Sequence, residues 1–284
     1  MGKGLLDPKV DFVFKNIFGS PNHPEILISF LNATLKAKKK IVNVDIKKTD
    51  IEKQYIEDKY SRLDVKATTS NDEIINIEIQ LKNENNMVKR SLYYLSKMYE
   101  EQLNEKEDYS KLVRTVCINI LNFKYLKTDN FHTGYRFKEI ESNEELTDIM
   151  EVHFIEIPKL QDSSDEKDML VAWTEFLKDP ESEKVRGLEL SIEEIRQAKD
   201  ELIRMSNDST QRELYDMRAN SLRDKMSELN AAERKGIEKG REEGREEGRK
   251  EEKIKIARNM KLSGLDTNTI AKVTNLSEDE IDKL

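Results

Sequence analysis

The chain has 284 residues, of which 36% are hydrophobic and 37% are charged, and its formal net charge at pH 7 is −8. This length can bury a sizeable core, but so many charged residues fit one compact domain with a solvated helical region better than two full cores. The sequence contains no charged-then-apolar leader and no run of about eighteen apolar residues, so we expect a cytoplasmic protein without a membrane span.

The acidic charge lies mostly in the second half of the chain. Residues 1–160 contain 25 Lys and Arg against 26 Asp and Glu, whereas residues 161–284 contain 24 against 31. The front half is therefore nearly neutral, and the overall charge does not exclude a nucleic-acid partner for it.

Two short helices are expected at the start. Apolar residues at helical spacing follow Asp7-Pro8 and stop at Gly19, and a second helix begins at Pro24 and runs into a lysine-rich segment. The lysines of this segment are Lys36, Lys38, Lys39, Lys40, Lys47 and Lys48. Such a patch neutralises the backbone phosphates of a nucleic acid without reading its sequence. The alternative is a solvated helix end whose lysines complement the helix dipole.

A pair of alternating runs, residues 61–70 and 73–80, predicts two half-buried strands after at least one strand within 41–57. Their apolar residues share a core only if residue 63 lies opposite 79, 65 opposite 77 and 67 opposite 75. This register places Asp64 opposite Glu78 on the other, polar face, where the two carboxylates can share a divalent cation. The turn at 70–72 must then contain an odd number of residues, or a bulge.

An alternative is that Asp64 and Glu78 are ordinary solvent-facing residues of an edge hairpin. Glu78 and Gln80 interrupt an isoleucine-rich run that we expect to be central, and central strands rarely tolerate unpaired acids. We therefore favour a metal site.

A helix and further strands follow the hairpin. Residues Val88, Leu92, Leu95, Tyr99 and Leu103 repeat at helical spacing and predict a core-facing stripe, with Arg90 and Tyr94 on the other side of the same helix. Strand-like runs occupy 113–123, 131–139 and 150–157, and Cys117 in the first of them is expected to be a small buried side chain. Strands framed by helices in this order predict an α/β fold with a mixed central sheet flanked by helices.

Beyond Pro158 the pattern is helical, with helices expected over 165–178, 191–206 and 210–230. Glycines then recur every four residues from Gly236 to Gly248 in a charged segment. Four glycines cost a helix about 4 kcal/mol relative to alanine, so we expect a flexible helical tether. The last segment has the rhythm of a small helix-turn-helix, but its surrounding acids favour a docking or oligomerising module over a DNA reader.

We therefore divide the chain into four parts: a core (1–160), a helical extension (161–232), a glycine-spaced tether (233–253) and a small C-terminal helical module (254–284).

Several motifs are similar to those of the Rpn group of recombination-promoting nucleases, also described as PD-(D/E)xK family transposases. They are DPKVDFVFKNIFG at 7–19, RLDVKA at 62–67, IEIQ at 77–80, RSLYYLSKMYEEQL at 90–103 and YDMRANSLRD at 215–224. The resemblance spans nearly the whole chain. It implies a restriction-endonuclease-like core and a Mg²⁺-dependent DNA endonuclease acting in recombination, mobile-element or phage-related DNA processing.

The resemblance also implies roles for individual residues. Asp64 and Glu78 would be metal ligands, and the carbonyl of Ile79 would complete the site. Gln80 stands where lysine is commoner, and an amide can hydrogen-bond the attacking water but cannot carry charge. Glutamine at this position is therefore expected to affect the rate of cleavage more than the presence of the metal site.

Two accessory residues are expected near these ligands. Asp11 on the first helix would add an outer acidic contact, and Lys66 on the face of Asp64 would supply a displaced cation. The alternative for Lys66 is an ordinary solvent-facing lysine.

Substrate contacts are expected from Arg90 and Tyr94, which the resemblance places near the scissile phosphate, and from Lys38 to Lys40. The alternative for Arg90 is a surface ion pair with Glu84 or Glu101. The expected partner is DNA, and the C-terminal region is a candidate site of self-association. Two other functions stay open: a catalytically degenerate DNA-binding or assembly protein, and a nuclease with RNA as substrate.

Overall fold

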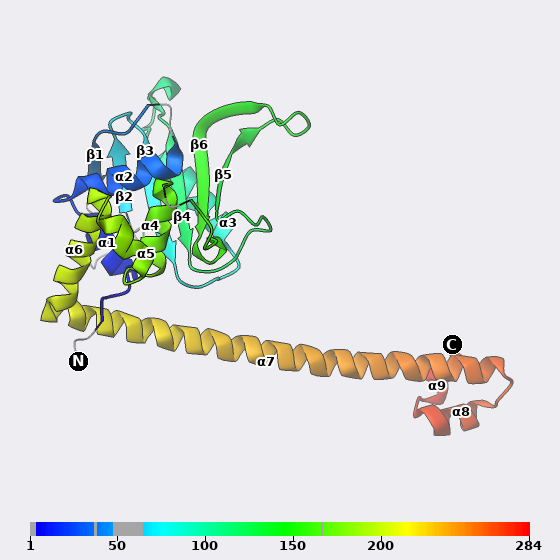
Figure 1. Cartoon of the computed structure of the whole chain (residues 1–284). Helices are drawn as coiled ribbons and strands as arrows, with labels where there is room; N and C mark the ends of the chain where they lie inside the picture. The colour runs from blue at the N-terminus through cyan, green and yellow to red at the C-terminus, as the bar shows by residue number, and fades with distance from the viewer. Residues whose placement is uncertain (1–3, 37–38, 48–64, 166) are drawn as a thin grey trace. The chain divides into compact units, whose positions relative to one another are not determined.

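The computed structural model describes residues 4–36, 39–47, 65–165 and 167–284, and it divides into two compact units, Met1–Asn220 and Ser221–Leu284 (Figure 1). The helices and strands of the first unit are α1 (Asp11–Phe18), α2 (Pro24–Leu35), β1 (Val44–Lys47), β2 (Val65–Thr69), β3 (Ile74–Gln80), α3 (Met87–Glu100), β4 (Thr115–Leu121), β5 (His132–Lys138), β6 (Glu145–Glu156), α4 (Met169–Lys178), α5 (Glu183–Glu189) and α6 (Glu193–Asn207). Helix α7 (Ser209–Leu262) begins in the first unit and ends in the second.

The described strands form a six-stranded mixed sheet in the order β1-β2-β3-β4-β6-β5. Strand β2 pairs antiparallel with both β1 and β3, whereas β3, β4 and β6 run parallel to one another and β5 pairs antiparallel with β6. All seven residues of β4 are buried, as expected for a parallel strand covered on both faces. The predicted α/β class with a mixed sheet and a helical extension is confirmed.

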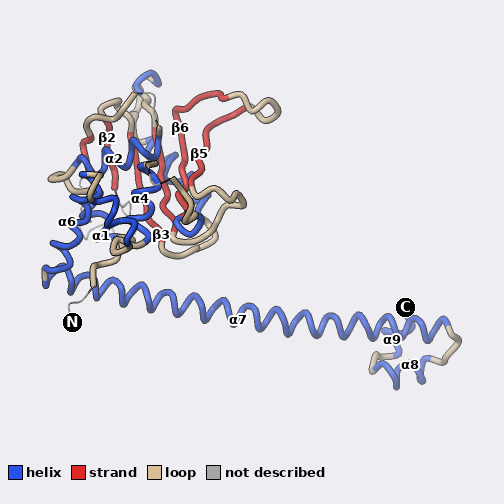
Figure 2. Tube along the Cα trace, in the orientation of Figure 1, coloured by secondary structure: helices blue, strands red, loops and turns tan. Residues whose placement is uncertain are grey.

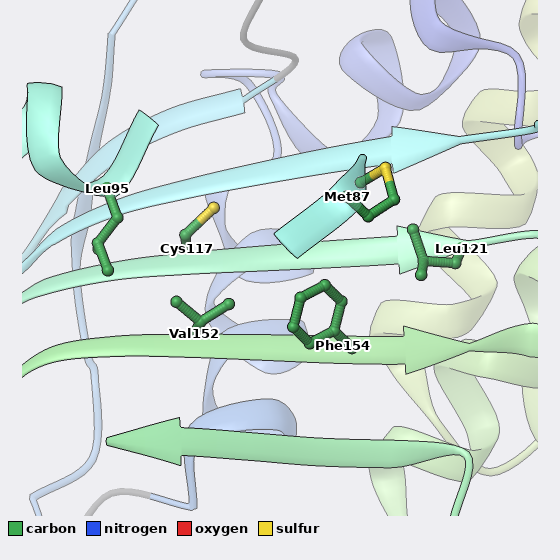
Figure 3. Close-up of a cluster of buried hydrophobic side chains, with 6 residues drawn as sticks. All are labelled: Met87, Leu95, Cys117, Leu121, Val152 and Phe154. Atoms are coloured by element: carbon green, nitrogen blue, oxygen red, sulfur yellow. The ribbon is translucent and has the colours of Figure 1, made fainter. Parts of the chain in front are cut away.

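Helices cover both faces of the sheet (Figure 2). On one face, α3 places Met87 and Leu95 over a cluster with Cys117, Val152 and Phe154, which Figure 3 shows together with Leu121. The helices on the other face share an aromatic core in which Phe18 packs against Phe14, Phe30 and Trp173, with ring centroids 4.6, 5.4 and 5.3 Å apart. The buried position predicted for Cys117 is confirmed, and burial raises the pKa of its thiol to about 12.

The predicted hairpin register is confirmed within the described residues. Val65 pairs with Ile77 and Ala67 with Ile75. The amide of Thr69 donates to the carbonyl of Glu73, so three residues form the turn, and Asp72 adopts a left-handed conformation with φ of 60°. The turn therefore contains an odd number of residues, as predicted. Residues 62–64 lie outside the described part of the chain.

Two expectations about burial are wrong. Strand β3 is central, as expected, but both of its faces are buried, and Glu78 is 0% exposed rather than facing solvent. On α3, the expected core residues Val88 and Leu92 are 41% and 49% exposed, whereas Tyr94 is buried. Both differences have the same cause: α3 covers a sheet face that carries polar side chains. Its buried side is therefore a mixed set, Met87, Ser91, Tyr94, Leu95 and Met98.

The helices after the sheet were only partly predicted. Helix α5 was not expected, and α4, α5 and α6 belong to the same compact unit as the sheet, which extends to Asn220 rather than ending near residue 160. Helix α7 is continuous over 54 residues and passes through the glycine repeat. Charged pairs such as Lys239 and Glu243, 3.5 Å apart, offset part of the glycine cost. The flexibility of this segment stays a prediction.

The second unit ends in three helical segments: the last turns of α7, then α8 (Thr267–Thr274) and α9 (Glu278–Asp282). Their small core consists of Ala257, Ile270, Leu276 and Ile281. Helix α9 begins with a capping box, in which the Ser277 and Glu280 side chains each bind the other residue's backbone amide. In the described chain, no helix has the length and apolar character needed to cross a membrane.

Candidate functional site

The candidate site is a layer of polar side chains between the central strands and α3. Alternation along β3 directs Asn76, Glu78 and Gln80 to the same face of the sheet. The parallel register sets Glu78 beside Asn119 of β4. On the other side of β3, Lys66 of β2 pairs with Asn76 and so shares this face.

Glu78 is the centre of this layer. Its carboxylate is fully buried; Oε2 accepts a hydrogen bond from Arg90 Nε at 3.2 Å, while Oε1 has no hydrogen-bond partner in the described chain. Burial raises the pKa of Glu78, and the nearby Arg90 guanidinium offsets only part of that rise. A buried carboxylate oxygen without a donor is costly, so this atom is poised to bind a cation or a water molecule.

Arg90 enters the layer from α3. Its side chain is 24% exposed, and its guanidinium lies over the Tyr94 ring, 5.3 Å from the ring centroid. Burial acts to lower the pKa of Arg90, but attraction to Glu78 and Tyr94 outweighs it, so the pKa is raised and the side chain stays charged. The ion pair formed is therefore with Glu78, whereas Glu101 lies 3.8 Å from both Lys66 and Lys97.

Two residues of the layer were missed by the sequence analysis. Ser91 Oγ lies 2.7 Å from the carbonyl of Met87 and 2.9 Å from Asn119 Oδ1, and the Asn119 amide donates to the carbonyl of His153 at 3.1 Å. These contacts fix α3 on β4 next to Glu78. The available signal was the polar pair Cys117 and Asn119, which alternates within an otherwise apolar strand.

The remaining predicted residues lie at several places. Gln80 ends β3, half-buried on the face of Glu78, and its carbonyl accepts from the Asn122 amide at 2.9 Å. The side chain of Ile79 is buried on the opposite face. Asp11 forms an ion pair with Arg218 of α7 at 2.7 Å. Its expected contact with the site stays a prediction.

The described part of the predicted lysine patch is accessible. Lys39 and Lys40 are exposed, and Lys36 pairs with Asp168 at 3.1 Å. Lys38 and the expected metal ligand Asp64 lie outside the described residues. The structure therefore gathers Glu78, Gln80, Lys66, Arg90 and Tyr94 on the α3 face, and the roles assigned to them stay predictions.

The described donor atoms around Glu78 are few but suit a divalent cation. Within the described residues, no group of three or more His, Cys, Asp or Glu side chains could hold an ion. Glu78 nevertheless provides a buried carboxylate oxygen that lacks a donor, which suits a hard cation such as Mg²⁺. With Gln80 on the same face of β3, this oxygen fits a hard divalent cation.

A second buried cluster lies on the opposite face of the sheet. His132 Nε2 and His153 Nδ1 are 2.9 Å apart, and His153 Nε2 lies 2.6 Å from Glu151 Oε1. Burial, followed by the neighbouring His153, lowers the pKa of His132 to about 4. Burial acts to raise the pKa of Glu151, but hydrogen bonds from His153, Arg114 and Arg136 outweigh it and hold the value at about 2. This network joins β5 to β6.

Comparison with protein families agrees with the fold. A family model described as PD-(D/E)XK nuclease family transposase matches residues 8–232. The chain therefore belongs to this family. A second model, the Rpn/YhgA-like nuclease family C-terminal HTH domain, matches residues 250–284, and so the predicted Rpn resemblance is confirmed. Searches of curated proteins and of solved structures gave no significant match.

Proposed function

We propose that the protein is a divalent-cation-dependent DNA endonuclease of the Rpn type, acting in recombination, mobile-element or phage-related DNA processing. The observation that carries this proposal is the Glu78 carboxylate: it is fully buried, one oxygen has no donor in the described chain, and an arginine lies beside the other. A carboxylate in such a place suits a metal ligand, because a buried acid without full pairing lowers stability.

The metal would be held by hard oxygen ligands. In the proposal these are the carboxylates of Asp64 and Glu78 and the backbone carbonyl of Ile79. Mg²⁺ bound there would lower the pKa of an attacking water molecule and polarise the phosphate. The family match and the residue types support this ligand set.

The chain's own residues would orient the reacting groups. The Gln80 amide, on the face of Glu78, would hydrogen-bond the attacking water without taking its proton. Arg90 would bind phosphate oxygens, and the buried Tyr94 ring would support its guanidinium rather than contact DNA itself. Lys38 to Lys40 would bind backbone phosphates away from the cleaved bond.

The test is nicking of supercoiled plasmid with Mg²⁺ and with a chelator. We expect cleavage by the wild-type protein only with Mg²⁺, and its loss in Asp64→Asn and in Glu78→Gln. Lys89→Ala, which removes an exposed charge from the same helix as Arg90, is the matched control and should cleave normally. Full activity in either carboxylate variant would contradict the ligand assignment.

A second candidate is a catalytically degenerate DNA-binding or assembly protein with the same fold. Gln80 favours it, because a glutamine stands where a lysine is commoner, and Arg90 neutralises Glu78 without any metal. This candidate predicts DNA binding that is insensitive to chelator, with no nicking. Replacing plasmid with structured RNA in the same assay tests the remaining substrate alternative, since the metal chemistry does not depend on the sugar.

The C-terminal module offers a second contact. Its match to an HTH domain supports DNA binding, whereas the acidic first turn of α9, with Glu278, Asp279 and Glu280, favours docking or self-association. We propose the docking role, and light scattering of full-length and truncated protein tests it.

A further inference from the structure

Arg90 contacts one of the two oxygens through which Glu78 would bind a cation. Its Nε lies 3.2 Å from Oε2, and Oε1 is the oxygen left without a donor in the described chain. A divalent cation at Oε1 would therefore lie a few ångströms from a guanidinium. Both are positive, and repulsion between like charges is strong where water is excluded.

The surroundings of Arg90 allow its side chain to move while the helix stays in place. Helix α3 is fixed to β4 by the hydrogen bond between Ser91 and Asn119 and by the buried Met87 and Leu95 (Figure 3). The Arg90 side chain, in contrast, is 24% exposed and has a path to solvent. Tyr94, 3% exposed, provides a fixed aromatic surface below the guanidinium.

We propose that Arg90 is a phosphate ligand released by the cation. Binding of a divalent cation at Glu78 displaces the guanidinium, which then binds a phosphate of the DNA. In the cation-free protein the same guanidinium neutralises Glu78. This inference rests on the proposed function, because it takes Glu78 as the metal ligand and DNA as the substrate.

The consequence is cooperative binding of cation and DNA. Without DNA, a binding cation must break the contact between Arg90 and Glu78. With DNA present, the released guanidinium forms a charge-assisted hydrogen bond to a phosphate, which offsets that loss. Linkage requires the effect to be reciprocal, so DNA must tighten cation binding by the same factor. The scheme also prevents Arg90 from engaging DNA productively before the cation is in place.

The first experiment measures cation affinity without DNA, by calorimetric titration of Mn²⁺ at pH 8. We expect Arg90→Ala to bind the cation about tenfold more tightly than wild type, because a hydrogen bond between charged groups contributes about 1.5 kcal/mol or more. Arg90→Lys, which keeps the charge, should change the affinity less. Lys89→Ala is the matched control and should match wild type.

Equal or weaker binding in Arg90→Ala would overturn the proposal, because it would mean that Arg90 does not compete with the cation. Fluorescence of the single, buried Trp173 reports whether each variant is folded. If Arg90→Ala does not fold, Arg90→Gln replaces it with the same expected direction.

The second experiment measures the salt dependence of DNA binding with and without Ca²⁺, under conditions where no cleavage is detected. In wild type, Ca²⁺ should steepen the slope of log K against log salt by about 0.9 more than in Arg90→Ala, the value for one additional phosphate contact. Equal changes in the two proteins would overturn the proposal. Taking the difference removes any direct attraction between Ca²⁺ and DNA, which both proteins share.

The proposed function and the inferred role of Arg90 can be refuted separately. If wild-type protein binds no divalent cation and does not cleave, the proposed function is wrong, and the inference falls with it. If wild type binds the cation and cleaves, but Arg90→Ala shows unchanged cation affinity and unchanged salt coupling, only the inference is wrong.

Discussion

Removing Arg90 from its ion pair with Glu78 should strongly destabilise the metal-free protein. Arg90→Met leaves the fully buried Glu78 carboxylate without its arginine partner. Breaking a buried pair in this way costs about 3–5 kcal/mol. Because Arg90 is 24% exposed and Glu78 can take up a proton, we expect about 3 kcal/mol at pH 7.5. Glu78→Gln removes the costly charge and should be neutral or stabilising by about 1 kcal/mol.

The double variant Arg90→Met with Glu78→Gln should regain nearly all of the lost stability. The coupling energy between the two positions is then about 3 kcal/mol, which a double-mutant cycle isolates. The assay is urea unfolding in the presence of a chelator, followed by fluorescence of Trp173, the single tryptophan, which is buried in the first unit. Adding a divalent cation should partly restore the stability of the Arg90→Met variant.

The same pair predicts a pH dependence with a defined sign. Burial raises the pKa of Glu78 above its value in the unfolded chain, so the folded protein takes up this proton more readily. The stability linked to this group is complete at low pH and is lost as the pH rises through the raised pKa. The destabilisation by Arg90→Met should therefore shrink on acidification. A variant as stable as wild type at pH 7.5, or an equal loss in the Glu78→Gln background, would refute the reasoning.

Four further predictions follow from other parts of the chain. Wild-type stability should fall as the pH drops from about 6.5 to 4, because the pKa of His132 in the folded protein is about 4 and its imidazole is protonated first in the unfolded chain. This contribution to the free energy of unfolding is on the order of 3 kcal/mol. It should disappear in His132→Gln, as measured by urea unfolding. Charge reversal of Lys38 to Lys40 should weaken DNA binding across sequences and flatten its salt slope by about 0.9 per lost contact, unless the patch is only a solvated helix end. A chain ending near Ala232 should stay folded and cleave DNA at least as fast as full length, most visibly at low salt, with less self-association by light scattering. The thiol of Cys117, fully buried and with a pKa of about 12, should resist alkylation until the protein unfolds; rapid labelling of folded protein would contradict its position.

The hairpin that carries Glu78 could be predicted because its information is local. Alternation with period two fixes which side chains share a face, and the need to bury both apolar sets fixes the register. The pairing of Val65 with Ile77, and the three-residue turn ending at Asp72, both follow from this argument. Their agreement with the structure shows how strongly a buried face specifies pairing.

The cover over Glu78 could not be predicted, because it depends on how α3 packs on the sheet. A helical stripe of apolar residues indicates the buried side only when the facing surface is also apolar. Here the facing surface carries Glu78 and Asn119, so α3 buries Ser91 and directs Arg90 inward, while Leu92 is left 49% exposed. The ion pair at the site is thus a product of tertiary packing and has no local sequence signal.

Diffraction from crystals soaked in Mn²⁺, with the metal located by its anomalous signal, tests the central claim most directly. Mn²⁺ accepts the carboxylate and carbonyl oxygens that suit Mg²⁺. The account predicts a peak at about 2.1 Å from Glu78 Oε1, with Asp64 as a second ligand and the Arg90 guanidinium moved off Oε2. A fully occupied metal elsewhere on the chain, with Arg90 still hydrogen-bonded to Glu78, would contradict it.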